Sequence, residues 1–139
     1  METYLEFKER TKKETEQFPM FFAFDNEQLK EGKKEIDASD DDKLLAIGGG
    51  GYIKVEDKQN LLDLFDSHEQ EHKSNMLAND DYVYHMVKYE LGNHEFVITY
   101  DTTDTFRACG LTKELLNNNP QLQEVVNKAV KDYAEEVGM

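Results

Sequence analysis

The stretch that most constrains the fold of this chain is the segment from Gly92 to Asp101. Its middle, Phe96-Val97-Ile98-Thr99-Tyr100, is an unbroken run of aromatic and β-branched residues, the types enriched in strands. Gly92 and Asn93 can both adopt positive φ and so end a preceding helix. Because the run lacks polar–apolar alternation, it predicts a central strand that helices cover on both faces.

Two other segments have the length and composition of strands. Met20–Phe24 follows a proline and is strongly apolar, and Gly51–Val55 follows a run of glycines. Together with Glu95–Tyr100 they predict a small three-stranded sheet packed by about five or six helices, which is an α+β fold. The apolar segment Leu44–Ile47 fits either a helix or a strand.

The chain is expected to form a single domain spanning residues 1–139. This length supports one substantial core, and no stretch has the composition of a linker. Several residues that favour helix ends mark the expected helix boundaries: Asp25 or Asn26, Asn79 or Asp80, Gly110, Thr112 and Pro120. These signals predict where helices begin and end, but not the order of the strands.

Four consecutive glycines, Gly48–Gly51, are the most unusual local feature. Glycine-rich loops can expose backbone N–H groups to a phosphate, but this run lacks both the Lys-Ser/Thr ending of a P-loop and the spacing of a dinucleotide fingerprint. No helix clearly begins on it. A tight turn or a bulge is therefore the favoured interpretation.

The charge of the chain is strongly negative, since thirty Asp and Glu exceed sixteen Lys and Arg and give a net charge of −14. No basic run is longer than Lys12-Lys13 or Lys33-Lys34, which disfavours direct binding of nucleic acid. Anionic lipid would also repel this surface. The acids are concentrated in Asp25–Asp42 and Glu56–Asp81, so the charge suits a basic protein partner or solubility alone.

Carboxylates displayed along helices can occupy the basic groove of a nucleic-acid-binding protein through the electrostatics that attract nucleic acid to it. This interpretation makes seven acidic residues the candidate partner-binding residues: Asp40, Asp41, Asp42, Asp63, Asp66, Glu69 and Glu71. The alternative is that the acidic residues only keep the protein soluble.

The segment His68-Glu69-Gln70-Glu71-His72 matches the pattern H-E-x-x-H. On a helix, this pattern places two histidines one turn apart as zinc ligands and a glutamate beside them as a general base. No second motif supplies the third ligand, for which Glu90, His94 and Glu95 are candidates. His68 and His72 are therefore weak metal-ligand candidates, and an amphipathic helix with histidines at the edge of its apolar face is the preferred reading.

The other reactive residue types have structural explanations. His94 and Glu95 lie at the opposite end of the expected strand from Asp101 and Asp104, so the four cannot converge on one site, and helix capping explains the two aspartates. Cys109 has no neighbouring base and is expected to be buried. No catalytic residue and no cofactor is predicted.

A cytoplasmic location is expected. The single cysteine excludes an internal disulfide, and the start of the chain, Met1–Glu6, has neither the basic residues nor the apolar core of a signal peptide. No stretch approaches the roughly 18 consecutive apolar residues that a membrane-spanning helix requires.

Three segments of the chain carry a family resemblance: Phe18–Phe24, Gly48–Ile53 and Tyr89–Asp101. In these segments the chain resembles a family, without an established activity, of short acidic proteins from low-GC, often gut-dwelling, bacteria and from their phages and mobile elements. In that setting, small acidic proteins often inhibit host defence, as anti-CRISPR proteins do. The resemblance implies such a role by association only, and it carries no catalytic residue across.

The favoured function is therefore a non-enzymatic acidic protein that docks on the basic nucleic-acid-binding surface of a partner, such as a CRISPR effector or another defence nuclease. One alternative is a metal-dependent hydrolase that uses His68, Glu69 and His72. Another is an accessory domain whose exposed aromatic residues form a homodimer. The partner and the oligomeric state are not predicted.

Overall fold

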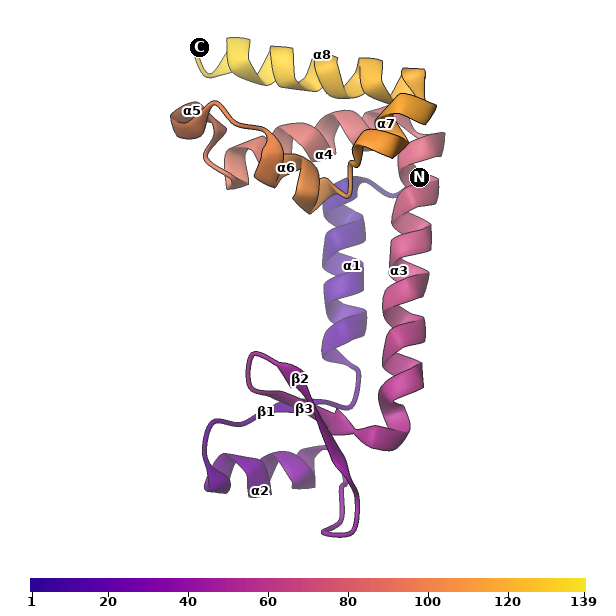
Figure 1. Ribbon diagram of the computed structural model, residues 1–139, viewed down its shortest axis with the longest axis vertical. Coiled ribbons are helices and arrows are strands. Elements are labelled where there is room, and N and C mark those ends of the chain that lie inside the picture. The colour runs from indigo at the N-terminus through magenta and orange to yellow at the C-terminus, as the bar shows by residue number, and fades with distance from the viewer. The chain divides into compact units, whose positions relative to one another are not determined.

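The computed structural model describes residues 1–139 as helices joined to one small sheet, and the predicted α+β class is confirmed (Figure 1). The helices are α1 (Tyr4–Glu16), α2 (Asn26–Glu35), η1 (Val55–Asp57, a single 3-10 turn), α3 (Lys58–Ala78), α4 (Asp80–Asn93), α5 (Phe96–Thr99), α6 (Thr103–Cys109), α7 (Lys113–Asn118) and α8 (Pro120–Glu136). The strands are β1 (Phe21–Phe22), β2 (Leu44–Gly48) and β3 (Gly51–Lys54).

The chain divides into two compact units. Unit 1 comprises Met1–Lys8 and Glu71–Met139, and unit 2 comprises Glu9–Gln70. The boundaries between the units fall inside α1 and α3. The expected single domain over residues 1–139 stays a prediction.

Unit 2 contains the whole sheet, whose strand order is β1-β3-β2 with both neighbouring pairs antiparallel. The three-stranded sheet is confirmed, and so are two of its predicted segments, Met20–Phe24 and Gly51–Val55, which contain β1 and β3. The third strand is Leu44–Gly48, in the segment for which the sequence left helix and strand open.

The prediction that Glu95–Tyr100 is the central strand was wrong. This segment forms the single helical turn α5, with Glu95 and Tyr100 at positive φ on either side of it. Only Phe96 is buried, whereas Ile98 is 74% and Tyr100 71% exposed. The β-branched run has no neighbouring strand to pair with, so its backbone groups are satisfied within the turn, and tertiary context overrides its strand propensity.

The four glycines form the hairpin between β2 and β3, which confirms the turn interpretation. Gly48 pairs with Gly51, and the two residues between them, Gly49 and Gly50, both have positive φ, of 59° and 82°. Type I′ turns require positive φ at both central positions, and glycine adopts it without a steric penalty. A register shift between Ala46 and Gly48 places a bulge directly before the turn.

Helix α2 packs closely on one face of the sheet, and a glycine makes this possible. The buried residues Phe21, Ala23 and Ile36 form the core of this contact. A Cβ atom at Gly32 of α2 would lie only 2.0 Å from the ring of Phe21. Gly32, which weakens the helix in isolation, therefore allows the helix backbone to approach the aromatic ring.

The core of unit 1 is centred on α4, which packs against α8 and α6 (Figure 1). Four residues of α4 are completely buried: Val83, Met86, Val87 and Leu91. They recur at steps of three and four, so one side of α4 faces the neighbouring helices. Leu122, Val126 and Ala129 of α8 complete this core.

Three helices, α2, α4 and α7, begin with side-chain caps that the sequence indicated. The side chain of Asp25 accepts a hydrogen bond from the amide of Gln28, Asn79 accepts from Asp81 and Tyr82, and Thr112 accepts from Leu115. Pro120 occupies the first turn of α8, and Gly110 ends α6 with φ of 74°. These bonds satisfy amides that have no partner inside their helices.

No helix in the structure is both long enough and apolar enough to cross a membrane.

The packing of α2 leads to a stability prediction for Gly32→Ala. Alanine favours an isolated helix over glycine by about 1 kcal/mol, but the added methyl group would overlap the Phe21 ring, and such overpacking costs about 1–3 kcal/mol or more. We expect Gly32→Ala to lower the midpoint of urea unfolding. Exposed Glu31→Ala is the matched control, and an equal or higher midpoint for Gly32→Ala would contradict this packing.

Candidate protein-binding surface

The outer side of α3 in unit 2 displays large apolar residues and carboxylates together. Leu62 is 49% and Phe65 47% exposed, and Asp66 and Glu69 are exposed beside them. These four positions follow the spacing i, i+3, i+4 and i+7, so they share one side of the helix. Asp63 is also exposed and lies next to this side. We call Leu62, Asp63, Phe65, Asp66 and Glu69 the α3 face.

The charges of the α3 face are not neutralised. No Lys or Arg occurs from Gln59 to Gln70. Asp63 accepts a hydrogen bond of 2.9 Å from the side chain of Gln59, and neither Asp66 nor Glu69 has a hydrogen bond or an ion pair. The α3 face therefore combines exposed apolar area with carboxylates that form no ion pair.

The acidic loop before β2 lies beside the start of α3. The Lys54 ammonium is 3.9 Å from a carboxylate oxygen of Asp42 and 3.8 Å from one of Glu56, so it bridges the two. Asp42 also accepts hydrogen bonds from the amide and hydroxyl of Ser39, and that amide bond holds the pKa of Asp42 below its usual range. The carboxylate of Asp42 thus stabilises the loop.

Asp40 and Asp41, in contrast, are exposed and form no hydrogen bond or ion pair. Unlike the carboxylate of Asp42, their carboxylates have no bonding partner in the chain, so they do not hold the loop together. We refer to Asp40, Asp41 and the α3 face together as the acidic surface of unit 2.

Six of the seven predicted partner-binding residues lie in unit 2, and the structure divides them into two groups. Asp40, Asp41 and Asp42 form the loop group, and Asp63, Asp66 and Glu69 form the helix group. Glu71 belongs to unit 1, is half-buried and has interactions of its own. It comes two residues after Glu69, which is about 200° around a helix, so it does not share the α3 face.

His72 of the H-E-x-x-H segment is half-buried and lies against aromatic residues of the unit 1 core. One ring nitrogen, Nε2, lies 2.8 Å from the carbonyl oxygen of Cys109, and the other, Nδ1, lies 2.6 Å from the hydroxyl of Tyr82. The carbonyl can only accept, so Nε2 donates to it and Nδ1 accepts from Tyr82. The ring also stacks on Phe7, with centroids 5.5 Å apart. Neither nitrogen is left for a metal ion.

The first histidine of that segment has a different environment. In unit 2, Nε2 of His68 lies 3.1 Å from a carboxylate oxygen of Glu14, which also pairs with Arg10. These contacts hold the pKa of Glu14 below its usual range, with the His68 hydrogen bond as the largest cause. No group of three or more His, Cys, Asp or Glu side chains is arranged to hold a metal ion.

A buried carboxylate, Glu90, connects α1 to α4 in unit 1. The hydroxyl of Tyr4 donates to Glu90 at 2.7 Å, and the ammonium of Lys8 lies 3.1 Å from the same oxygen. His94 lies 3.3 Å from the second oxygen. Glu90 is only 2% exposed, and although burial raises its pKa, the hydrogen bonds from Tyr4 and Lys8 outweigh this and lower it.

This network is structural in character. Burial and the Glu90 hydrogen bond raise the pKa of Tyr4, and burial raises the pKa of Cys109 to about 12. A thiol with such a pKa is not a nucleophile at neutral pH. The predicted buried Cys109 is therefore confirmed, and His94 makes its contact with Glu90 rather than with Asp101 or Asp104.

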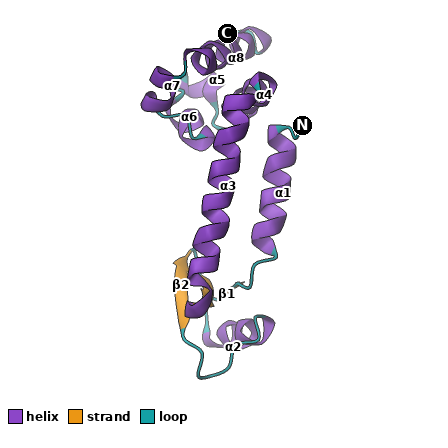
Figure 2. Cartoon of the chain, turned by 90° about the vertical axis from the view of Figure 1, so that its right-hand side faces the viewer, coloured by secondary structure: helices purple, strands orange, loops and turns teal.

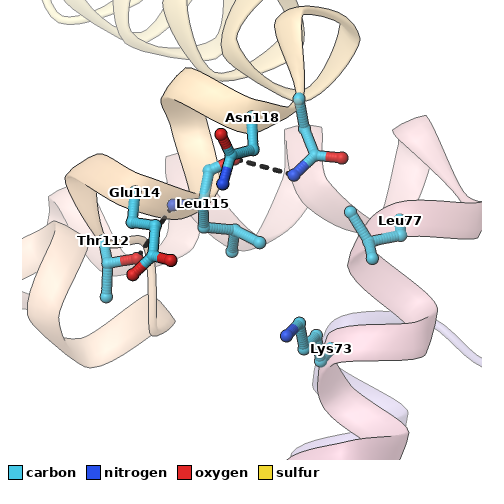
Figure 3. Close-up of a pocket in the computed structure, with 7 residues that line it drawn as sticks. Lys73, Leu77, Thr112, Glu114, Leu115 and Asn118 are labelled. Atoms are coloured by element: carbon cyan, nitrogen blue, oxygen red, sulfur yellow. Dashed lines mark hydrogen bonds between the residues drawn. The ribbon is translucent and has the colours of Figure 1, made fainter.

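An open pocket of 350 Å³ in unit 1 lies between the last turns of α3 and α7. Figure 3 shows Lys73 and Leu77 on α3 facing Thr112, Glu114 and Leu115. The hydrogen bonds drawn there belong to the local structure of α7, because Thr112 caps the helix and an asparagine bonds the Leu115 carbonyl. The pocket does not assemble a nucleophile with a base, and no motif in the sequence predicted it.

The comparisons with known proteins place the chain in a family. A model described as "Family of unknown function (DUF7659)" matches residues 3–132. The chain belongs to this family. No curated protein and no solved structure matches the chain. The match extends from the start of α1 into α8, so it concerns both units rather than one motif.

The neutral state of His72 leads to a prediction about pH. Burial lowers its pKa below 6.5, so the unfolded chain takes up a proton first as pH falls, and the free energy of unfolding should decrease from about pH 7.5 to 5.5. His72→Phe should lack this contribution, and it should cost about 1–3 kcal/mol at pH 7.5 because the Tyr82 hydroxyl loses its partner.

Urea unfolding of both proteins at several pH values measures this difference. Exposed His85→Gln is the control and should keep the wild-type pH dependence. An identical pH dependence for His72→Phe and the wild type would contradict the neutral, buried assignment.

The Glu90 network leads to a stability prediction for more acidic pH. The lowered pKa means that ionised Glu90 stabilises the fold above its ordinary value of 4.5, and that this contribution is lost as pH falls below it. Glu90→Gln should lower the free energy of unfolding at pH 7 by about 1–3 kcal/mol, and the difference from wild type should shrink at acidic pH. Thermal unfolding at pH 7 and pH 4 tests this, with exposed Glu114→Gln as control. A difference that does not change with pH would rule out a stabilising ionised Glu90.

Proposed function

We propose that this protein is a non-enzymatic binding protein that docks, through the acidic surface of unit 2, on the basic nucleic-acid-binding surface of a partner protein. The observation that carries the proposal is the α3 face, where Leu62 and Phe65 are exposed among carboxylates that form no ion pair with Lys or Arg. Apolar and aromatic residues supply much of the affinity of protein interfaces, and charges supply specificity and speed of association.

The composition of unit 2 supports this proposal. Residues 9–70 contain sixteen Asp and Glu and nine Lys and Arg. The negative potential of such a surface repels nucleic acid and attracts basic protein surfaces. A mixed face of this kind fits a groove whose basic rim binds phosphates and whose floor is apolar or aromatic.

The partner class follows from the charge together with the family resemblance. A basic protein that processes nucleic acid, such as a CRISPR effector or another defence nuclease, offers the complementary surface. Occupation of that surface would inhibit the partner by excluding its substrate. On this proposal the protein acts in the cytoplasm and needs no cofactor.

The proposal predicts the effect of reversing the charges of the α3 face. The triple variant Asp63→Lys, Asp66→Lys, Glu69→Lys should lose partner binding, and Phe65→Ser should weaken it by about tenfold or more, as expected for an aromatic residue at the centre of an interface. The matched control carries the same change of charge in unit 1, at exposed and unpaired Glu114, Glu124 and Glu135.

The measurement is retention of host proteins from nuclease-treated lysate on the tagged protein, followed by binding assays with each purified partner. Binding should weaken steeply with salt and should be competed by double-stranded DNA. Equal loss of binding in the unit 1 control would show that net charge alone is responsible. Binding that is insensitive to salt and to DNA would refute the proposed site.

A further inference from the structure

Strand β2 has a free edge in the sheet of unit 2. Because the strand order is β1-β3-β2, only one side of β2 is paired. Figure 2 shows β2 in orange along one side of this unit, with no strand beyond it. Of the two edge strands it is the longer, with five residues against two in β1. It is therefore the edge that offers a template for another strand.

The hydrogen-bond register identifies which groups are free. The amide of Val55 donates to the carbonyl of Lys43 at 2.9 Å, so these two residues form a hydrogen-bonded pair. In an antiparallel ladder such pairs alternate, so Leu45 is hydrogen-bonded to Ile53, whereas Leu44 and Ala46 direct their N–H and C=O groups away from β3. No other group of the chain bonds to them.

This edge has little of the protection that edge strands normally carry. Proline, inward-pointing charges and covering loops are the usual devices, and β2 from Leu44 to Gly48 contains no proline and no charged residue. The bulge after Ala46 limits the pairing length at one end, and Lys43 precedes the strand. Ala46 and Ile47 are exposed.

We propose that the free edge of β2 binds an extended, basic segment of the partner by β-strand addition. This inference rests on the proposed function and specifies how part of the partner is held. In this mode, backbone hydrogen bonds to Leu44 and Ala46 supply affinity, and alternate side chains of the added strand supply specificity.

Charge complementarity selects the occupant. Asp40 and Asp41, which are exposed and unpaired, come four and three residues before Leu44, the first residue of β2, so their carboxylates add negative charge near one end of the edge. A second copy of this chain would bring the same excess of acids to the edge, which disfavours pairing with itself. A strand that carries Lys or Arg gains attraction there instead.

The side chains beside the edge of β2 indicate which residues of the added strand would be apolar. Leu45 faces the same side of the sheet as its partner Ile53, which is completely buried. On the same side, Ile47 and Phe22 lie over Gly51, close enough that a Cβ atom there would meet both. An added strand would extend this apolar side with every second residue and present its basic residues on the other side.

The test uses two synthetic peptides of equal length and charge, one alternating Lys and Val and the other alternating Lys and Pro. Each is titrated into the full isotope-labelled chain and followed by amide NMR spectra and hydrogen exchange. The Lys–Val peptide should bind, and it should slow exchange of the Leu44 and Ala46 amides by about tenfold or more. The Lys–Pro peptide lacks half of its amides and should not protect them.

The variant Ala46→Pro provides the matching change in the protein. It removes an N–H that points away from β3, so no hydrogen bond of the β2–β3 ladder is lost, and proline is tolerated at such edge positions. Ala46→Pro should abolish binding of the Lys–Val peptide, whereas Ala46→Val, which keeps the N–H, should retain it. If Ala46→Pro does not fold, the comparison of the two peptides with the wild-type protein still decides the question.

Three results would overturn the inference: equal binding of both peptides, no binding of the Lys–Val peptide, or unchanged binding to Ala46→Pro. These outcomes are separable from failure of the proposed function. A partner that is lost by the charge-reversed α3 variant but retained by Ala46→Pro supports docking through the acidic surface and rejects strand addition. A partner that is lost by Ala46→Pro and kept by the charge-reversed variant supports the β2 edge and rejects the α3 face.

Discussion

The burial of Glu90 is the interaction on which the arrangement of unit 1 depends. A carboxylate that is almost fully removed from water is costly unless it is both neutralised and hydrogen-bonded. Tyr4 and Lys8, one turn apart on α1, meet both requirements, so the first turns of α1 have a defined position on α4. If α1 packed elsewhere, the buried carboxylate of Glu90 would lose these two partners. Alternative packings of this helix are therefore unfavourable.

The same first turns of α1 also connect to the second polar network. Phe7 stacks on His72, and Tyr4 packs edge-on against Tyr82, whose hydroxyl donates to that histidine. Since His72 in turn donates to the carbonyl of Cys109, the end of α6 is tied to α3 and α4. His72, whose pattern in the sequence suggested metal binding, is therefore used to orient helices. Both of its ring nitrogens have hydrogen-bond partners within the fold.

How far the sequence predicted the structure depended on whether the signal was local. Caps such as Asp25, Asn79 and Thr112 act within one turn, and the helix boundaries that they indicated are close to those observed. The Phe96–Tyr100 run was misread because strand formation requires a partner that no local pattern reveals. Likewise, Gly32 weakens α2 in isolation, and only the tertiary structure shows that it allows α2 to pack closely against Phe21. For the candidate site, the acids of the α3 face were recognisable by charge, but the exposure of Leu62 and Phe65 was not, because their spacing also fits a core-facing side.

The fold is connected to the proposed function by a contrast between polar groups that have hydrogen-bond partners within the chain and polar groups that have none. In the core of unit 1, Glu90 and His72 have partners for their polar atoms, and such saturated networks stabilise a structure without offering a binding site. In unit 2, exposed carboxylates lack partners, the α3 face exposes apolar side chains, and the edge of β2 retains unpaired backbone groups. Each of these features alone occurs on many monomeric proteins. Their presence in one unit of 62 residues provides charge, apolar contact area and backbone hydrogen-bonding groups together, which are the three components that a protein interface uses.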